Sequence, residues 1–245
     1  MLNISLRLAT RTMIAVALLA CSFPAYAQTY PSRLIKLIVP FPAGTATDTE
    51  ARFLADKVGT TLGQKIIVEN KAGANGNLGA TEAARAQPDG YTLYLATNST
   101  HSANVHLYTK LPFDPVADFT PIARLTRNPL LFVARPPRST DLLGGQIEFV
   151  ITDVAVTREF IAAGPPGYEF AAWVGLFAPA GTPKQIVDRL NRAFTDAITS
   201  PEATRFFADV ELEPDVSTPE GLAAHVKAQT ELWGRIISES GLEKI

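Results

Sequence analysis

The stretch LIKLIVPFPAGTATDTE, residues 34–50, decides the fold. It opens with a nearly continuous apolar run over 34–39, which is typical of a strand buried in a parallel sheet. A loop over 41–46 follows. Thr47 and Glu50 then have the spacing of a capping box with Thr47 as N-cap, and apolar residues at helical spacing come after them. The stretch therefore predicts a strand, a loop and a helix in that order.

The same pattern occurs twice more along the chain. Residues 65–70 predict a second strand, and the glycine-rich segment 73–79 leads into an alanine-rich helix that ends near Pro88. Residues 91–97 predict a third strand, followed by the polar loop 98–101. Strands that alternate with helices indicate a parallel sheet with right-handed crossovers. Because ligands bind beyond the carboxyl ends of such strands, we expect the three loops to form a site.

The second half of the chain predicts shorter strands and three more helices. Asp153 is expected on a loop that follows one of these strands. Capping residues and prolines mark the starts of the helices. The expected elements are strands at 130–133, 146–151 and 173–178, and helices after Thr182, near Pro201 and after Thr218.

The first 27 residues have the pattern of a secretory signal peptide. Arg7 and Arg11 precede an apolar run over 13–20, and Ala25-Tyr26-Ala27 provides a small-residue cleavage site. The run is shorter than the roughly 20 residues that a membrane-spanning helix needs. We therefore expect export to the periplasm and no membrane insertion of the mature chain. In the alternative interpretation, Leu18-Leu19-Ala20-Cys21 is a lipobox whose cysteine carries a lipid anchor.

The composition limits the kinds of partner and of chemistry that the chain can have. The chain has 22 Lys and Arg against 24 Asp and Glu, and it has no basic run, which argues against a nucleic-acid partner. Its single Cys falls in the first 27 residues, so cleavage there leaves no disulfide or thiol nucleophile. His101, His106 and His225 lack metal-ligand spacing, and no P-loop or G-x-S-x-G motif occurs. We expect a small-molecule partner, no metal and no cofactor.

A set of motifs, ordered along nearly all of the chain after residue 27, carries a resemblance to a known family. The motifs are 30–41 with Gly44 and Asp48, 68–80, 88–93, 107–115 with Asp118 and Phe119, 144–146, 166–169 and 173–183. Together they resemble the Bug family, the periplasmic receptors of tripartite tricarboxylate transporters. Because the motifs agree in order and span so much of the chain, the resemblance is specific.

The resemblance implies an α/β fold and no enzymatic activity. The architecture would be the two-lobed Venus-flytrap of periplasmic binding proteins, whose parallel-sheet lobes clamp a small carboxylate and deliver it to the membrane components of the transporter. Lobe one would comprise residues 28–127 plus 173–245, and lobe two residues 128–172.

The family's binding loops map onto ten residues of this chain. Thr47 and Asp48 are the side chains expected to contribute most, and Asp153 would come from the second lobe. Backbone amides and hydroxyls would hold the carboxylates, in part through water. The ten residues are Ala43, Gly44, Thr47, Asp48, Asn77, Gly79, Ser99, Thr100, His101 and Asp153.

The chain departs from the family pattern in two respects. Thr45 stands where family members usually have a second glycine, which adds a side chain where the ligand should approach. The family also carries several tens of residues between the equivalents of Ser139 and Thr140, and a smaller piece between those of Gly164 and Pro165. The segment that remains, 128–172, is close to the lower limit for a domain with its own core. We therefore expect a truncated second lobe and weak or absent ligand binding.

Two other functions stay open from the residues alone. Asp48, Asp153 and His101 could act together in a small hydrolase, in which case an Asp48 variant would lose turnover. In the other alternative, the missing pieces expose apolar surface, and a protein that binds no ligand associates with itself.

Overall fold

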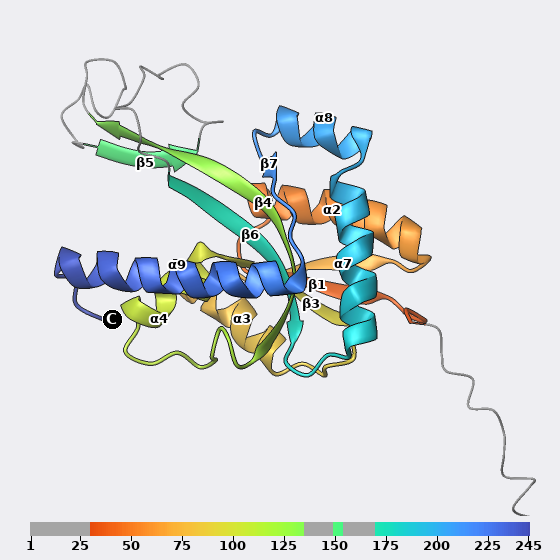
Figure 1. Ribbon diagram of the computed structural model, residues 1–245, viewed down its shortest axis with the longest axis horizontal. Helices are drawn as coiled ribbons and strands as arrows, with labels where there is room; N and C mark the ends of the chain where they lie inside the picture. Colours follow the sequence, from red (N-terminus) through yellow and green to blue (C-terminus); the bar gives the residue numbers. More distant parts are fainter. Residues whose placement is uncertain (1–29, 135–148, 154–169) are drawn as a thin grey trace, which may run out of the picture. The chain divides into compact units, whose positions relative to one another are not determined.

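The computed structural model describes residues 30–134, 149–153 and 170–245 (Figure 1). The chain divides into two units, Met1–Ser32 and Arg33–Ile245. The elements of the second unit are β1 (Ile35–Val39), α2 (Ala46–Leu62), β2 (Ile66–Asn70), the 3₁₀ turn η1 (Ala74–Gly76), α3 (Asn77–Ala84), β3 (Thr92–Thr97), the π-helical turn η2 (Ser99–Ala103), α4 (Asn104–Leu107), β4 (Phe119–Ala134), β5 (Phe149–Asp153), β6 (Phe170–Pro179), α7 (Lys184–Ile198), α8 (Pro201–Asp209), β7 (Glu213–Pro214) and α9 (Pro219–Ser240).

Three parallel strands form one half of the sheet. β1 lies between β2 and β3, and Leu37 is in register with Val68 on one side and with Leu93 on the other. Helix α2 connects β1 to β2, and α3 connects β2 to β3. β1 is buried along most of its length, as its apolar run predicts. The predicted order of strand, loop and helix is confirmed for all of this half.

The other half of the sheet is antiparallel, which the sequence pattern did not predict. β6 pairs antiparallel with β3 and β4, and β5 and the short β7 pair antiparallel with β4, in the order β2-β1-β3-β6-β4-β5. Fully buried strands such as β6 have the same apolar pattern in either direction, so the pattern could not reveal it. β4 is 16 residues long, and two register shifts against β6 bend it. Asp153 ends β5 rather than lying on the predicted loop.

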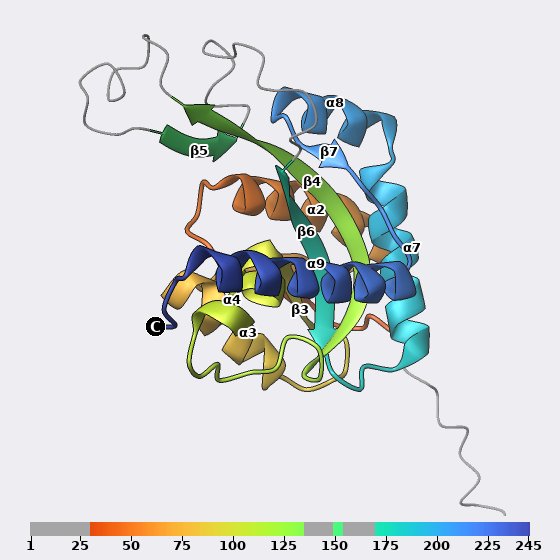
Figure 2. The ribbon, with the colours of Figure 1, turned by 60° about the vertical axis from the view of Figure 1, so that its left-hand side comes forward.

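Helices cover both faces of the sheet (Figures 1 and 2). On one face, side chains of β1, β3 and β6, such as Ile38 and Tyr94, form a core with Ala80 of α3 and Leu222 of α9. On the other face lie α2 and α7, which also contact each other. No helix in the described ranges is long and apolar enough to cross a membrane.

The described residues of the predicted second lobe continue this same sheet. Of this segment, β4 contains residues 128–134, β5 contains 149–153 and β6 contains 170–172. The rest of that segment, 135–148 and 154–169, lies outside the described residues, so the division into two lobes stays a prediction.

Glu50 of α2 is completely buried against β4. The hydroxyl of Thr126 donates to its carboxylate and lies 3.0 Å from both oxygens. Burial raises the pKa of Glu50 to about 8, although the hydrogen bond from Thr126 acts in the opposite direction. The folded protein therefore favours a neutral carboxyl group at this position.

His101 is completely buried on the other side of the sheet. Its ring lies among those of Tyr94, Phe113, Phe119 and Phe177, with centroids 4.5 to 6.4 Å away. Burial lowers the pKa of His101 to about 3, so the ring is neutral in the folded protein.

We predict that Glu50 and His101 limit the stable pH range from opposite sides. The pKa of Glu50 lies above the value of 4.5 for an unperturbed Glu, so stability falls as the pH rises from 4.5 to about 8. The pKa of His101 lies below its ordinary 6.5, so stability falls as the pH drops from 6.5 to about 3. Glu50→Gln should therefore remove an alkaline loss of about 3 kcal/mol between about pH 5 and 8. His101→Phe should flatten the acid side.

Urea unfolding at a series of pH values measures both effects. Glu239→Gln, which changes an exposed carboxylate on α9, is the matched control and should leave the profile unchanged. An alkaline loss of unfolding free energy that persists in Glu50→Gln would contradict the assignment.

Candidate ligand-binding site

Three loops meet at the carboxyl ends of the parallel strands. They follow β1, β2 and β3, as the parallel topology predicts. Gly76 of the second loop lies between the other two, because a Cβ atom at this position would be 2.5 Å from Cγ2 of Thr100 and 3.1 Å from Cβ of Pro40. Gly76 also has a φ of +87°, which disfavours a side chain. A residue larger than glycine would force the loops apart.

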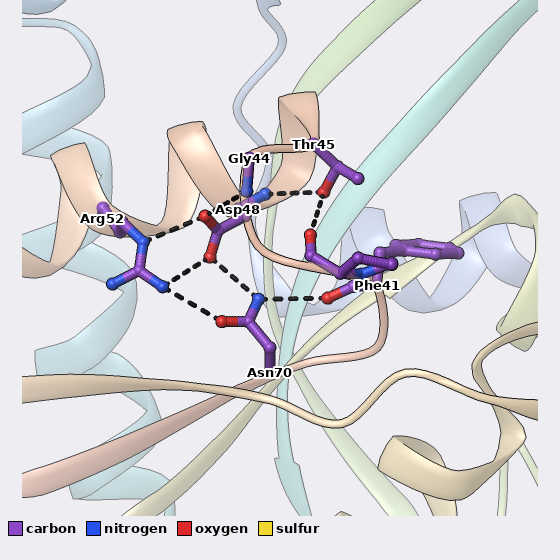
Figure 3. Close-up of polar contacts among 7 residues, drawn as sticks. Phe41, Gly44, Thr45, Asp48, Arg52 and Asn70 are labelled. Carbon is purple, nitrogen blue, oxygen red and sulfur yellow. Dashed lines mark hydrogen bonds and ion pairs between the residues drawn. The ribbon is translucent and has the colours of Figure 1, made fainter.

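Asp48 joins the first loop to the end of β2 through a buried carboxylate (Figure 3). It accepts hydrogen bonds from the backbone N–H of Gly44 at 2.9 Å, from Nε of Arg52 at 2.9 Å and from Nδ2 of Asn70 at 2.8 Å. Asn70 also donates to the carbonyl of Phe41 at 3.0 Å and accepts from Arg52 at 3.0 Å. Burial opposes ionisation of Asp48, but these three donors outweigh it and lower its pKa. Asp48 is therefore an anion that holds the loops in place.

The N-cap of α2 is Thr45, and the prediction of Thr47 was wrong. Oγ1 of Thr45 accepts from the backbone N–H of Asp48 at 3.4 Å and donates to the carbonyl of Pro42 at 2.9 Å. Thr45 and Asp48 have the same spacing as Thr47 and Glu50, so the capping pattern fits both pairs. Burial of Glu50 against β4 decides between them. The hydroxyl of Thr45, expected to obstruct the ligand, is engaged within its own loop.

Three asparagines join the second and third loops. Nδ2 of Asn104 donates to Oδ1 of Asn77 at 2.7 Å and to the carbonyl of Asn75 at 3.1 Å, and Asn75 donates back to Oδ1 of Asn104 at 2.8 Å. Asn77 and Asn104 are buried. The side chain of Asn77 therefore holds loops together. Sequence reasoning missed Asn104 because it lies three residues beyond the predicted loop.

Of the predicted binding residues without a polar side chain, Gly79 is buried, whereas Ala43 and Gly44 are exposed. A Cβ atom on Gly79 would lie 3.1 Å from the carbonyl oxygen of Lys71 and 3.3 Å from Cα of Pro40, so this glycine lets α3 pack closely on the sheet. Ala43 and Gly44 are exposed, and Gly44 has a φ of +85°.

The third loop is more deeply buried than the sequence predicts. The hydroxyl of Thr100 bonds to the backbone of Thr97, and Oγ1 of Thr100 lies 3.2 Å from Nδ1 of His101. Thr100 and His101 are fully buried, whereas Ser99 is partly exposed. The ring of His101 does not reach the surface, which is a correction to its expected contact with a ligand. Burial also lowers the pKa of this ring to about 3, far from the value of an efficient general base near neutral pH.

The structure places the backbone of Asp153 but not its side chain. Asp153 ends β5 opposite Leu130 of β4, and the side chains of this strand lie outside the described residues. Its contribution to the site stays a prediction. Sequence reasoning also missed Arg52 and Asn70, although the spacing of Arg52 four residues after Asp48 is typical of a helical ion pair.

The arrangement of the loops suits an anion. Helices α2 and α3 both begin at this edge of the sheet, where first-turn amides and the helix dipole favour negative charge. The Asp48 carboxylate is countered by Arg52, so it does not leave an unpaired negative charge beside those amides.

Comparison with known proteins identifies the family of the chain. The model of the tripartite tricarboxylate transporter family receptor matches residues 50–150 and 146–242. A UPF0065 protein from Pseudomonas sp. (strain P51), encoded in the tcbD-tcbE intergenic region, is 27% identical over an alignment of 316 positions that covers 94% of each chain. Since 94% of 245 residues is about 230, some 86 positions of the 316-residue alignment have no counterpart in this chain, which confirms the expected shortening.

Solved structures show the same fold. The periplasmic binding protein BugD superposes with a TM-score of 0.76 at 26% identity, covering 88% of this chain and 100% of its own. MatC from Rhodopseudomonas palustris, with bound malate, superposes with a TM-score of 0.73 at 28% identity, covering 85% and 100%. The motifs, the family match and the fold therefore agree. The chain belongs to the receptors of the tripartite tricarboxylate transporter family, the Bug group of periplasmic solute-binding proteins.

Proposed function

We propose that this chain binds a small carboxylate in the periplasm and presents it to the membrane components of a tripartite tricarboxylate transporter. The observation that carries the proposal is the meeting of three loops around Gly76, at the edge of the sheet where α2 and α3 begin. The family supports the role of receptor, and the malate bound to MatC supports the ligand class. Such a receptor performs no catalysis.

We assign different tasks to the predicted site residues. Ala43, Gly44, Thr47 and Ser99 keep part of their surface exposed and are the proposed ligand contacts. The buried side chains of Asp48, Asn77 and Thr100 instead fix the loops that carry those contacts. Gly79 and the ring of His101 serve packing, and Asp153 stays a proposed contact from the other side of the ligand.

The shortened second lobe limits the affinity in this proposal. A carboxylate held from one side keeps part of its water shell, so hydrogen bonds to it compete with water and contribute less. We therefore infer weak binding at the three loops.

Malate should raise the melting temperature, because a ligand that binds the folded state stabilises it by mass action. Its uncharged dimethyl ester is the control ligand and should have no effect. Thr47→Val should lower the affinity about tenfold, the contribution of one hydrogen bond to a charged group, without changing the melting temperature of the free protein. Thr61→Val, an exposed position on the same helix, is the matched control variant. An equal rise with the ester, or no rise with any small carboxylate, would refute the proposal.

Asp48→Asn should destabilise the free protein and also abolish the response to malate. Loss of the buried charge leaves the donors of Arg52, Gly44 and Asn70 poorly paired, which should lower the free energy of unfolding by about 1 to 3 kcal/mol. Asp56→Asn, on the same helix with a side chain that is 76% exposed, should change it little. Chemical unfolding measures the effect. An Asp48→Asn variant as stable as the unmodified protein would show that the carboxylate does not organise the loops.

A further inference from the structure

β2 has an unpaired edge in the part of the chain that the structure describes. It stands at the end of the sheet and pairs there with β1 alone. The carbonyl of Lys65 and the amide of Lys71 both bond to β1, at 2.9 and 2.8 Å. Since backbone groups alternate in direction along a strand, Ile66 and Val68 direct their N–H and C=O groups outward. These groups can pair with another strand.

The side chains along this edge are also uncovered. Ile67 is 48% exposed and lies on the same face of the strand as Lys65 and Glu69. Helix α3 is on this face, but it has only eight residues and packs on β1 and β3. A groove runs along β2 beside α2 and reaches the strand edge at Ile67; Ala55, Asp56, Gly59, Ile66 and Val68 are among the residues that line it.

We propose that β2 pairs antiparallel with β2 of a second copy of this chain, with the two-fold axis beside Ile67. In this register Ile66 lies opposite Val68 of the second copy, and their outward N–H and C=O groups form hydrogen bonds. The two Ile67 residues face each other as a non-hydrogen-bonded pair, where opposing side chains come closest. Lys65 lies opposite Glu69 of the second copy, twice by symmetry, and adds to the ion pairs that Glu69 makes with Lys36 and Lys71 of its own chain.

The side chains of β2 favour this register over the registers shifted by one residue in either direction. A two-fold axis beside Ile66 would place Lys65 opposite Ile67, and an axis beside Val68 would place Ile67 opposite Glu69. Only the axis beside Ile67 joins apolar with apolar and Lys with Glu. Burial of Ile67 and the two ion pairs then act together, in the way that side-chain pattern sets strand register.

The pairing also leaves room for the helices. Helix α2 contacts both β1 and β2. With its axis above the space between these two strands, which are about 4.8 Å apart, the two copies of α2 would run roughly 10 Å from each other, the usual distance for packed helices. The groove beside β2 lies where the second helix would approach. Because the strands are antiparallel, the ligand loops of the two copies open at opposite ends of the joined sheet.

The test uses the protein expressed with its own leader and purified from the periplasm. Light scattering over a dilution series should give twice the mass of one chain at high concentration, falling toward a single mass on dilution. Ile67→Lys and Ile67→Glu should each be monomeric, because like charges would face each other across the axis. An equimolar mixture of the two should regain the doubled mass, because Lys then faces Glu.

Val116→Lys is the matched control, since Val116 is 65% exposed and lies outside β2. It should associate like the unmodified protein, and circular dichroism should show that all variants are folded. A single mass for the unmodified protein at every concentration would overturn the proposal. So would a doubled mass in both Ile67 variants, or a mixture that fails to associate when each variant alone is monomeric.

Discussion

Burial of β1 on both faces organises the parallel half of the sheet. Isoleucine, leucine and valine side chains point to both sides of this strand, so it is stable only where α2 covers one face and α3 covers the other. Helices that connect parallel strands leave from their carboxyl ends. The loops before them are therefore gathered at one edge, and the packing of Pro40, Gly76 and Thr100 is a direct result.

The second requirement is electrostatic. Removing the Asp48 carboxylate from water is unfavourable unless hydrogen-bond donors surround it, and Gly44, Arg52 and Asn70 provide them. The same bonds tie the first loop to the end of β2, so the loop that we propose to contact a ligand is ordered without one. Pre-ordering of this kind reduces the entropy lost on binding.

The sequence predicted the features that depend on neighbouring residues. The apolar run at 34–39 and the glycine-rich segment at 73–79 identified the strands, loops and helices of the parallel half. The sequence did not distinguish Thr45 from Thr47 as N-cap, because both pairings have the same spacing. The burial of His101 could not be predicted from its sequence neighbours, because the phenylalanines that enclose its ring come from positions 113, 119 and 177. For the same reason, the sequence did not reveal that Asn77 links two loops or that Thr100 bonds within its own loop.

The long strand β4 bears on how a receptor can lose part of its length. The family model matches in two parts that overlap at residues 146–150, and the two gaps expected from the sequence lie at 139–140, between β4 and β5, and at 164–165, between β5 and β6. A deletion at such a place removes residues without cutting through a helix or strand of the remaining sheet. The three loops that follow β1, β2 and β3 and the two expected gaps thus belong to separate stretches of the chain. A receptor with this arrangement can lose segments between β4 and β6 and keep the part of the sheet that carries the three loops.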